Sequence, residues 1–399
     1  MKAIKKQFLI PCYLENFRCI GSLCEDTCCK GWKVSLDKKT YKQYKKINDK
    51  NADLSLGKYI ALDKERENDT SYGCINMNAD GTCPFLTEDL LCKIHGELSE
   101  DLLSYTCYSY PRLVNRVNGL YEMSGTLSCP EIARLVLLDE EPMEFKDVSL
   151  MIKREYLTSI TLEYTEDFDR FSNLMYHFWP LRIFTISTLQ DRRYSVQERL
   201  ILLGLVYKKL IQLSNNKELH KAVMTIESYK DLFNDLEKMK EVLSESKKNE
   251  EEFPFSQVFV TQFTELVGEN FYTAVNYLQV VDNIADALQI HDGSFEKIKE
   301  NYKLADEKYY SPYMGEREYI IENYLVNEVF KEMYPLARTE SIDSSYKMLL
   351  TLYNVIKFHL VGISAYYKKL DDHTVVNTIQ AFSKAILHHK SYLNIFQSE

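Results

Sequence analysis

The stretch Ser195-Val-Gln-Glu-Arg-Leu-Ile-Leu-Leu-Gly-Leu-Val-Tyr-Lys-Lys-Leu-Ile-Gln-Leu213 decides the fold class of this chain. Its serine stands three residues before Glu198, and this spacing is the capping-box signature of a helix N-terminus. Apolar side chains then recur every three or four residues, which is the period of an amphipathic α-helix. These side chains belong to Leu200, Leu203, Val206, Leu210 and Leu213.

Helical patterns of the same kind fill most of the chain beyond this stretch. They predict helices over residues 257–290, 295–310, 316–334, 342–370 and 373–390. The runs are separated by prolines, which are Pro180, Pro254, Pro312 and Pro335. We therefore expect an all-α domain over residues 146–399. The polar stretch 244–252 is typical of a loop, so this domain could divide into two subdomains near residue 250.

Residues 1–145 have a different character. Gly, Pro, Asn and Asp recur there with little periodicity, as in the stretch 71–84, and only short helices are predicted, at 37–47 and 130–138. All ten cysteines of the chain lie between Cys12 and Cys129. The expected fold class is therefore mainly α, with an irregular cysteine-rich metal-binding module over residues 1–145 followed by the multi-helix domain.

Composition excludes several classes of protein. The chain has 399 residues, 45% hydrophobic and 27% charged, which is ordinary for a globular protein and excludes disordered and collagen-like chains. Only Phe8-Leu9-Ile10 is apolar before Pro11, which is too short for a signal peptide. The most apolar stretch, 349–367, contains Lys357 and His359, so a buried helix is expected there. We expect a cytoplasmic protein with no membrane partner.

The net charge is −10, which makes a nucleic-acid partner unexpected. The charge is uneven, because residues 1–46 carry eleven basic and only four acidic side chains. This basic opening could meet an acidic partner or could consist of solvated surface lysines.

The cysteines fall into short-spaced groups that suit metal ligation. Cytoplasmic thiols stay reduced, so clustered cysteines there are more often metal ligands than disulfides. No Cys-x-x-Cys pair is present, which favours an iron–sulfur cluster over zinc and argues against a redox motif. We expect about four ligands from the set Cys24, Cys28, Cys29, Cys83, Cys92, Cys107 and Cys129. Cys12 and Cys74 are expected to be small packed residues, and Cys19 stays undecided.

The start of a radical S-adenosylmethionine motif is also present. Such enzymes use Cys-x3-Cys-x2-Cys, and Cys24 and Cys28 have the first spacing. The third position is Gly31, so a radical enzyme of the familiar kind is not expected.

Several stretches together carry a family resemblance. They are 13–34, 83–112, 127–134, 189–204, 319–327 and 379–388, and the first contains Cys24-Glu-Asp-Thr-Cys28-Cys29. These stretches resemble the flagellin lysine N-methylase family. The stretch 83–112 also resembles a broader family of zinc- or iron-chelating cysteine-rich domains. At Lys384 that methylase family leads us to expect arginine, so the resemblance is incomplete there.

The resemblance implies transfer of methyl groups from S-adenosylmethionine to lysine side chains of flagellin, accompanied by a cysteine-bound cluster, most simply 4Fe-4S, with zinc as the alternative. No Gly-x-Gly-x-x-Gly loop is present, so the usual nucleotide site is not expected. The methyl donor would then bind between the cysteine module and the helices. Two other functions stay open, a non-catalytic zinc-stapled helical adaptor and an iron–sulfur redox protein.

Residues for the chemistry are less clearly marked. Lysine methylation needs a neutral amine, so aromatic walls that desolvate the lysine are useful. Candidate walls and bases are Tyr105, Tyr108, Tyr110 and Glu131, although packing of the tyrosines and a helix N-terminal charge at Glu131 are the favoured explanations. Arg112 and Arg134 could hold the donor carboxylate or neutralise helix ends. The apolar faces of the helices could also serve a homodimer.

Overall fold

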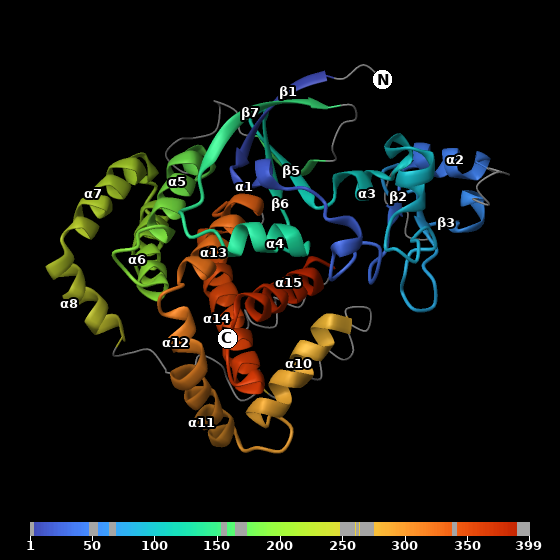
Figure 1. Cartoon of the computed structure of the whole chain (residues 1–399). Coiled ribbons are helices and arrows are strands. Elements are labelled where there is room, and N and C mark those ends of the chain that lie inside the picture. Colours follow the sequence, from blue (N-terminus) through green and yellow to red (C-terminus); the bar gives the residue numbers. More distant parts are fainter. Residues whose placement is uncertain are drawn as a thin grey trace.

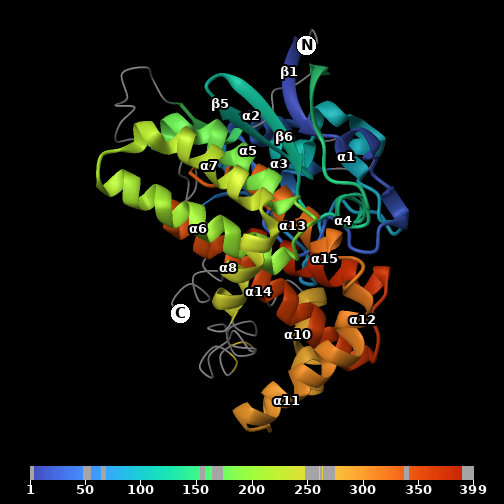
Figure 2. The ribbon, with the colours of Figure 1, turned by 90° about the vertical axis from the view of Figure 1, so that its left-hand side faces the viewer.

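A computed structural model of the chain describes residues 4–47, 55–63, 69–152, 158–163, 174–247, 260, 263, 275–336 and 341–388. Helices make up most of these residues, so the expected mainly α class is confirmed (Figure 1). Strands lie at one end of the molecule and α11 at the opposite end (Figure 2).

A five-stranded sheet forms the end of the molecule that contains the N-terminus. Its order is β7-β1-β6-β5-β8, with the bounds β1 Ile4–Pro11, β5 Arg112–Val117, β6 Leu120–Gly125, β7 Phe145–Ile152 and β8 Thr158–Leu162. The β5–β6 hairpin turns at Asn118 and Gly119, which both have positive φ (45° and 82°), as the tight right-twisted hairpin turn requires. The sequence does not predict these strands.

The sheet joins residues on both sides of the expected boundary between 145 and 146. Strand β7 pairs antiparallel with β1 along eight residues, from Ile4 opposite Ile152 to Pro11 opposite Phe145. Strand β1 also pairs in parallel with β6. Most of the cysteine-rich part of the chain is therefore inserted between β1 and β5, two strands of the same sheet. The division into domains stays a prediction.

A smaller unit carries most of the cysteines. It contains a second sheet of order β2-β4-β3, made of β2 (Ser35–Leu36), β3 (Ile60–Leu62) and β4 (Gly73–Ile75), together with the predicted short helix α2 (Lys38–Lys46). Its own core is small and includes Leu36, Tyr44 and Phe85. Short irregular connections surround this core, including η1 (Gly21–Leu23), η3 (Ile94–Leu98) and α3 (Tyr105–Ser109).

The helical body packs around α14. The helices are α4 (Pro130–Leu137), α5 (Phe178–Leu189), α6 (Val196–Asn215), α7 (Ala222–Asn234), α8 (Leu236–Lys247), α10 (Val275–Leu288), α11 (Phe295–Ala305), α12 (Ser311–Met314), α13 (Tyr319–Lys331), α14 (Ile342–Tyr367) and α15 (Asp372–His388). Among the described residues, only α14 is long and apolar enough to span a membrane, and 67% of its apolar window is buried. It is the core helix expected from the sequence.

The predicted helix starts and runs agree well with the structure. Ser195 caps α6, and its hydroxyl and the Glu198 carboxylate make both hydrogen bonds of the capping box. The runs predicted at 295–310, 316–334, 342–370 and 373–390 correspond to helices. Of the run 257–290, the described continuous part is α10, and the division near residue 250 lies outside the described residues.

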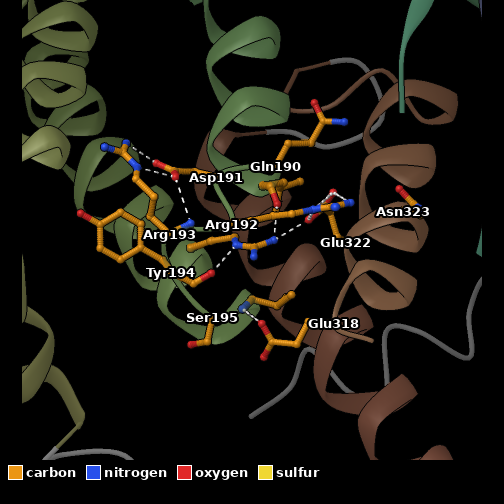
Figure 3. Close-up of polar contacts among 12 residues, drawn as sticks. Gln190, Asp191, Arg192, Arg193, Tyr194, Ser195, Glu318, Glu322 and Asn323 are labelled. Atoms are coloured by element: carbon orange, nitrogen blue, oxygen red, sulfur yellow. Dashed lines mark hydrogen bonds and ion pairs between the residues drawn. The ribbon is translucent and has the colours of Figure 1, made fainter. Parts of the chain in front are cut away.

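Buried ion pairs fix the helices to one another and to the large sheet. Glu322 of α13 is fully buried, and its carboxylate accepts a hydrogen bond from Arg192 at 2.9 Å (Figure 3). It accepts another from Arg199 at 2.7 Å. Arg182 of α5 pairs with Glu122 of β6 at 2.7 Å. Such pairs are geometrically demanding, and losing one partner strands a buried charge. Arg192 and Arg199 lie in the stretch 189–204, and Glu322 lies in the stretch 319–327. Both stretches of family resemblance therefore have a structural role.

Candidate functional site

Four of the candidate thiols lie together in the small unit. Cys28 comes from the loop after η1, Cys83 and Cys92 from the two sides of a turn, and Cys107 from α3. The backbone N–H of Cys83 donates to the Cys29 carbonyl at 2.8 Å, which ties the first two segments together. Ser104 caps α3 by accepting a hydrogen bond from the Cys107 N–H. Four separate segments thus converge on one place.

Burial and the neighbouring thiols both favour the protonated form of these cysteines. Burial, with smaller contributions from the nearby Cys92 and Cys28, raises the pKa of Cys83 to about 11. Burial likewise raises the pKa of Cys107 to about 12, with added contributions from Cys28, Cys92 and Cys83. The protein alone therefore holds them as neutral thiols at neutral pH. A bound cation would offset the repulsion among thiolates and the cost of burying them.

The donor set fits a soft metal or cluster by its chemistry. Cys28, Cys83, Cys92 and Cys107 are four sulfur donors, the number that 4Fe-4S clusters and structural zinc sites use. In the described part of the chain, no group of three or more His, Cys, Asp and Glu side chains is arranged to hold a metal ion. The thiols would have to turn toward the metal on binding, so ligation stays a prediction.

The remaining candidate cysteines form a second group next to the first. Cys129 is buried at the start of α4, and burial raises its pKa to about 12, with Cys24 and Cys28 contributing. The Cys24 thiol donates to the Asp26 carbonyl at 3.4 Å, and Cys29 lies beside Cys28. Cys28 therefore lies within electrostatic reach of both groups. Cys19 is exposed, and Cys74 lies in β4.

A cavity of about 280 Å³ lies beside this second group. One wall is the cysteine loop, a second is the segment 82–90, and the third is formed by α10 and α15. Its lining residues are Cys24, Glu25, Asp26, Thr27, Lys30, Thr82, Leu86, Leu90, Val275, Asn276, Tyr277, Ala381 and Lys384. This is the place that the sequence predicts for the methyl donor, between the cysteine module and the helices. The volume is near the lower end of small-molecule sites.

A buried ion pair closes one side of the cavity. The Lys384 ammonium of α15 lies 2.7 Å from Asp26 of the cysteine loop, and both side chains are almost buried, at 13% and 11% exposure. Gln380, one turn earlier on α15, donates to Asp26 at 2.9 Å and to the Ser128 carbonyl at 2.7 Å. Asp26 is thus held by two residues of α15, and the cavity has both signs of charge.

Arg134 and Glu131 lie behind this wall. Arg134 pairs with Glu25 at 2.8 Å and with Glu131 at 3.0 Å. Although burial opposes it, the hydrogen bond from Arg134 lowers the pKa of Glu25 overall. Glu131 lies in the first turn of α4, where a negative charge suits the helix dipole. Arg134 therefore contacts the cavity through Glu25, without lining it.

The aromatic candidates and Arg112 lie outside the cavity lining. The Tyr110 ring packs on Trp32 with centroids 5.4 Å apart, and its hydroxyl lies 3.1 Å from the Ser128 hydroxyl. Burial raises the pKa of Tyr110 well above its usual value. Tyr105 and Tyr108 belong to α3. Arg112, at the start of β5, has its guanidinium over the Phe17 ring at 5.0 Å.

Asp26, Lys384 and Tyr277 are among the cavity residues that the sequence reasoning about the site misses. Asp26 stands between two candidate ligands, Lys384 lies in a stretch of family resemblance, and Tyr277 has no local signal at all. The position of Asp26 within the cysteine motif could have marked it. Tyr277 could not be found, because only the packing of α10 brings it to the cavity.

Comparison with known proteins defines the class of this chain. The family model of the FliB lysine N-methylase C-terminal domain matches residues 182–399, which is more than half of the chain. This range includes α10 and α15, the helical wall of the cavity. The chain therefore belongs to this family, as the sequence resemblance indicates. The match begins after the cysteine-rich part, which it leaves unassigned.

Individual relatives match a shorter part of the chain. A lysine-N-methylase of Salmonella typhimurium is 36% identical over 142 residues, covering 35% of each chain. The lysine-N-methylase of Salmonella choleraesuis gives the same values. The flagellar biosynthetic protein FliU of Salmonella muenchen is 38% identical over 134 residues, covering 33% of this chain and 78% of the relative. The matches thus span about a third of the two lysine-N-methylases. No solved structure matches the chain.

Proposed function

We propose that this chain is a protein-lysine N-methyltransferase that transfers a methyl group from S-adenosylmethionine to lysine Nε of flagellin. The names of the relatives support lysine methylation and a flagellar setting. The observation that carries the proposal is the cavity between the cysteine loop and the family-matched helices α10 and α15. It is a concave site with apolar walls and charged groups of both signs, as small-molecule sites usually are.

The reaction sets the demands on this cavity. The lysine ammonium first loses a proton, and the Nε lone pair then attacks the methyl carbon of the sulfonium. An N–C bond forms, the C–S bond breaks, and its electrons stay on sulfur as a neutral thioether. Free lysine has a pKa near 10.4, so desolvation must lower it. The cavity walls Leu86, Leu90 and Tyr277 would supply that desolvation.

The charged groups have complementary roles in the proposal. Lys30 and Lys384 supply positive charge for the donor carboxylate, and Asp26 supplies negative charge for the sulfonium. Glu25 faces the same cavity and could take the lysine proton or pass it to solvent. The Arg134 pair holds Glu25 in place.

A metal group would be held by Cys28, Cys83, Cys92 and Cys107, as an iron–sulfur cluster with zinc as the alternative. When bound, the group would rigidify the loop that carries Asp26, because it ties together the four segments that support the loop. The cytoplasmic location, the absence of nucleic-acid and membrane partners, and a homodimer stay predictions.

Mass spectrometry of flagellin tests the function directly. Metal-loaded protein is incubated with flagellin and isotope-labelled S-adenosylmethionine, and labelled methyl groups are expected on lysines. Asp26→Asn should reduce transfer at least tenfold, about 1.4 kcal/mol in the transition state. Asp286→Asn on the exposed side of α10 is the matched control and should transfer normally. Unlabelled lysines after incubation with fully loaded protein would refute the proposal.

A further inference from the structure

A tight turn stands at the mouth of the cavity, over residues 87–91. The Thr87 N–H donates to the Leu91 carbonyl at 2.8 Å, and the Leu91 N–H donates to the Thr87 hydroxyl at 3.0 Å. Leu86 and Cys92 form a β-bridge at its base, so the turn stands on the group of four thiols. These hydrogen bonds and the β-bridge hold the turn in one conformation. Leu90, at its tip, also lines the cavity.

Leu90 is an unusual residue for its place. Its φ is 59°, in the left-handed region that glycine and asparagine occupy at least cost. Its side chain is nevertheless 41% exposed, so burial in this chain repays little of that strain. Strain of this kind tends to be retained at functional positions. Contact with another molecule would explain why an apolar side chain is retained at this exposed position.

Other exposed apolar side chains surround the same opening. Leu23 is 80% exposed and precedes the lining residue Cys24. Leu91 and the lining residue Val275 are also exposed. The segment of Leu23 lies against the turn, because a Cβ on Gly21 would come within 3.3 Å of the Leu91 side chain. Contiguous exposed apolar surface of this kind marks interaction sites.

The turn also carries negative charge. Glu88 and Asp89 are both exposed and directly precede the two leucines. For neither of them does the described part of the chain provide an ion pair. The mouth, defined as Leu23, Glu88, Asp89, Leu90, Leu91 and Val275, is therefore apolar and acidic. Its chemical complement is a basic segment with apolar side chains.

We propose that the mouth binds the polypeptide segment that presents the substrate lysine, and that it selects lysines flanked by apolar side chains. This inference rests on the proposed function. The carboxylates attract the lysine, the leucines pack on its neighbours, and the cavity behind them receives Nε. Substrate choice is thereby made at the rim, apart from the groups that handle the methyl donor.

Leu90→Asn tests this without endangering the fold. Asparagine tolerates the left-handed backbone, so the variant should melt at the wild-type temperature or above it. Two peptides serve as probes, one with leucines on both sides of a single lysine and one with serines there. For wild-type protein, KM should be about tenfold lower with the leucine peptide. Leu90→Asn should remove most of this preference, which is measured as the ratio of the two KM values within one variant and does not depend on any change in kcat.

The control is Leu120→Asn, which changes a more exposed leucine at the start of β6. It should keep the preference for the leucine peptide. Equal KM values for both peptides with wild-type protein, or an undiminished preference in Leu90→Asn, would overturn the inference while methyl transfer still stands. If methyl transfer itself is absent, fluorescence anisotropy of the two labelled peptides decides the same question by affinity. The inference would also be overturned if the mouth bound a second copy of this chain and neither peptide.

Discussion

At the scale of single residues, His359 shows how the core controls the response to pH. It lies on α14 without exposure, and its ring is surrounded by Phe263, Phe358 and Phe382. One ring nitrogen lies 2.7 Å from the Val355 carbonyl and the other 2.9 Å from the Tyr277 hydroxyl. Burial lowers the pKa of His359 to about 4. The neutral ring is thus part of the folded core.

A pH dependence of stability follows. The unfolded chain has a histidine pKa near 6.5 and takes up a proton between pH 6.5 and 4, whereas the folded chain does not. The stabilising effect is therefore complete above about pH 6.5 and is lost as the pH falls. Urea unfolding at pH 7 and pH 5 should show a loss that is about 2 kcal/mol larger for wild type than for His359→Gln. Equal losses would contradict the assignment of a neutral buried ring.

At the scale of elements, the Lys384–Asp26 ion pair and the hydrogen bond from Gln380 to Asp26 attach α15 to the cysteine loop. Lys384 and Asp26 are almost buried, so removing the cation strands a carboxylate. Lys384→Met should destabilise the loop by about 2 kcal/mol and speed hydrogen exchange over residues 19–30. Lys384→Arg, which restores the residue expected from the family resemblance, should retain protection. Lys297→Met, at an exposed pair on α11, is the control and should change little.

The helices could be predicted from the sequence because each has local signals. Ser195 and Glu198 mark a start, and the leucines of α6 mark a buried face. The strands lack such signals: β1 reads Ile-Lys-Lys-Gln-Phe-Leu-Ile-Pro, and its outer half is largely exposed. Its partners are β6 and β7, far along the chain. Pairing at that separation leaves no mark in a local pattern, and the same holds for Tyr277 in the cavity.

At the scale of the whole molecule, the cysteine-rich unit has a small core of its own, and metal should supply much of its stability. Cys107→Ser should lower the content of bound iron or zinc, measured by elemental analysis. It should also lower the melting temperature of this unit. The reason is that metal-binding free energy becomes folding free energy where the protein core is small. Cys74→Ser, in β4, is the matched control and should keep its metal. Full metal content in Cys107→Ser would show that other thiols ligate.

The pairing of β1 has a consequence for synthesis of the chain. Phe8 faces Tyr121 of β6 on one side and Val148 of β7 on the other, so the first strand to leave the ribosome must wait for these two later strands. During that interval its edges are open to other chains, which is the usual route to aggregation. The cysteine-rich unit between them is produced meanwhile, and under the proposed function it can fold and bind its metal first. Slow supply of the proposed metal would therefore appear as poor yield of the large sheet, whose strands contain none of the four proposed ligands.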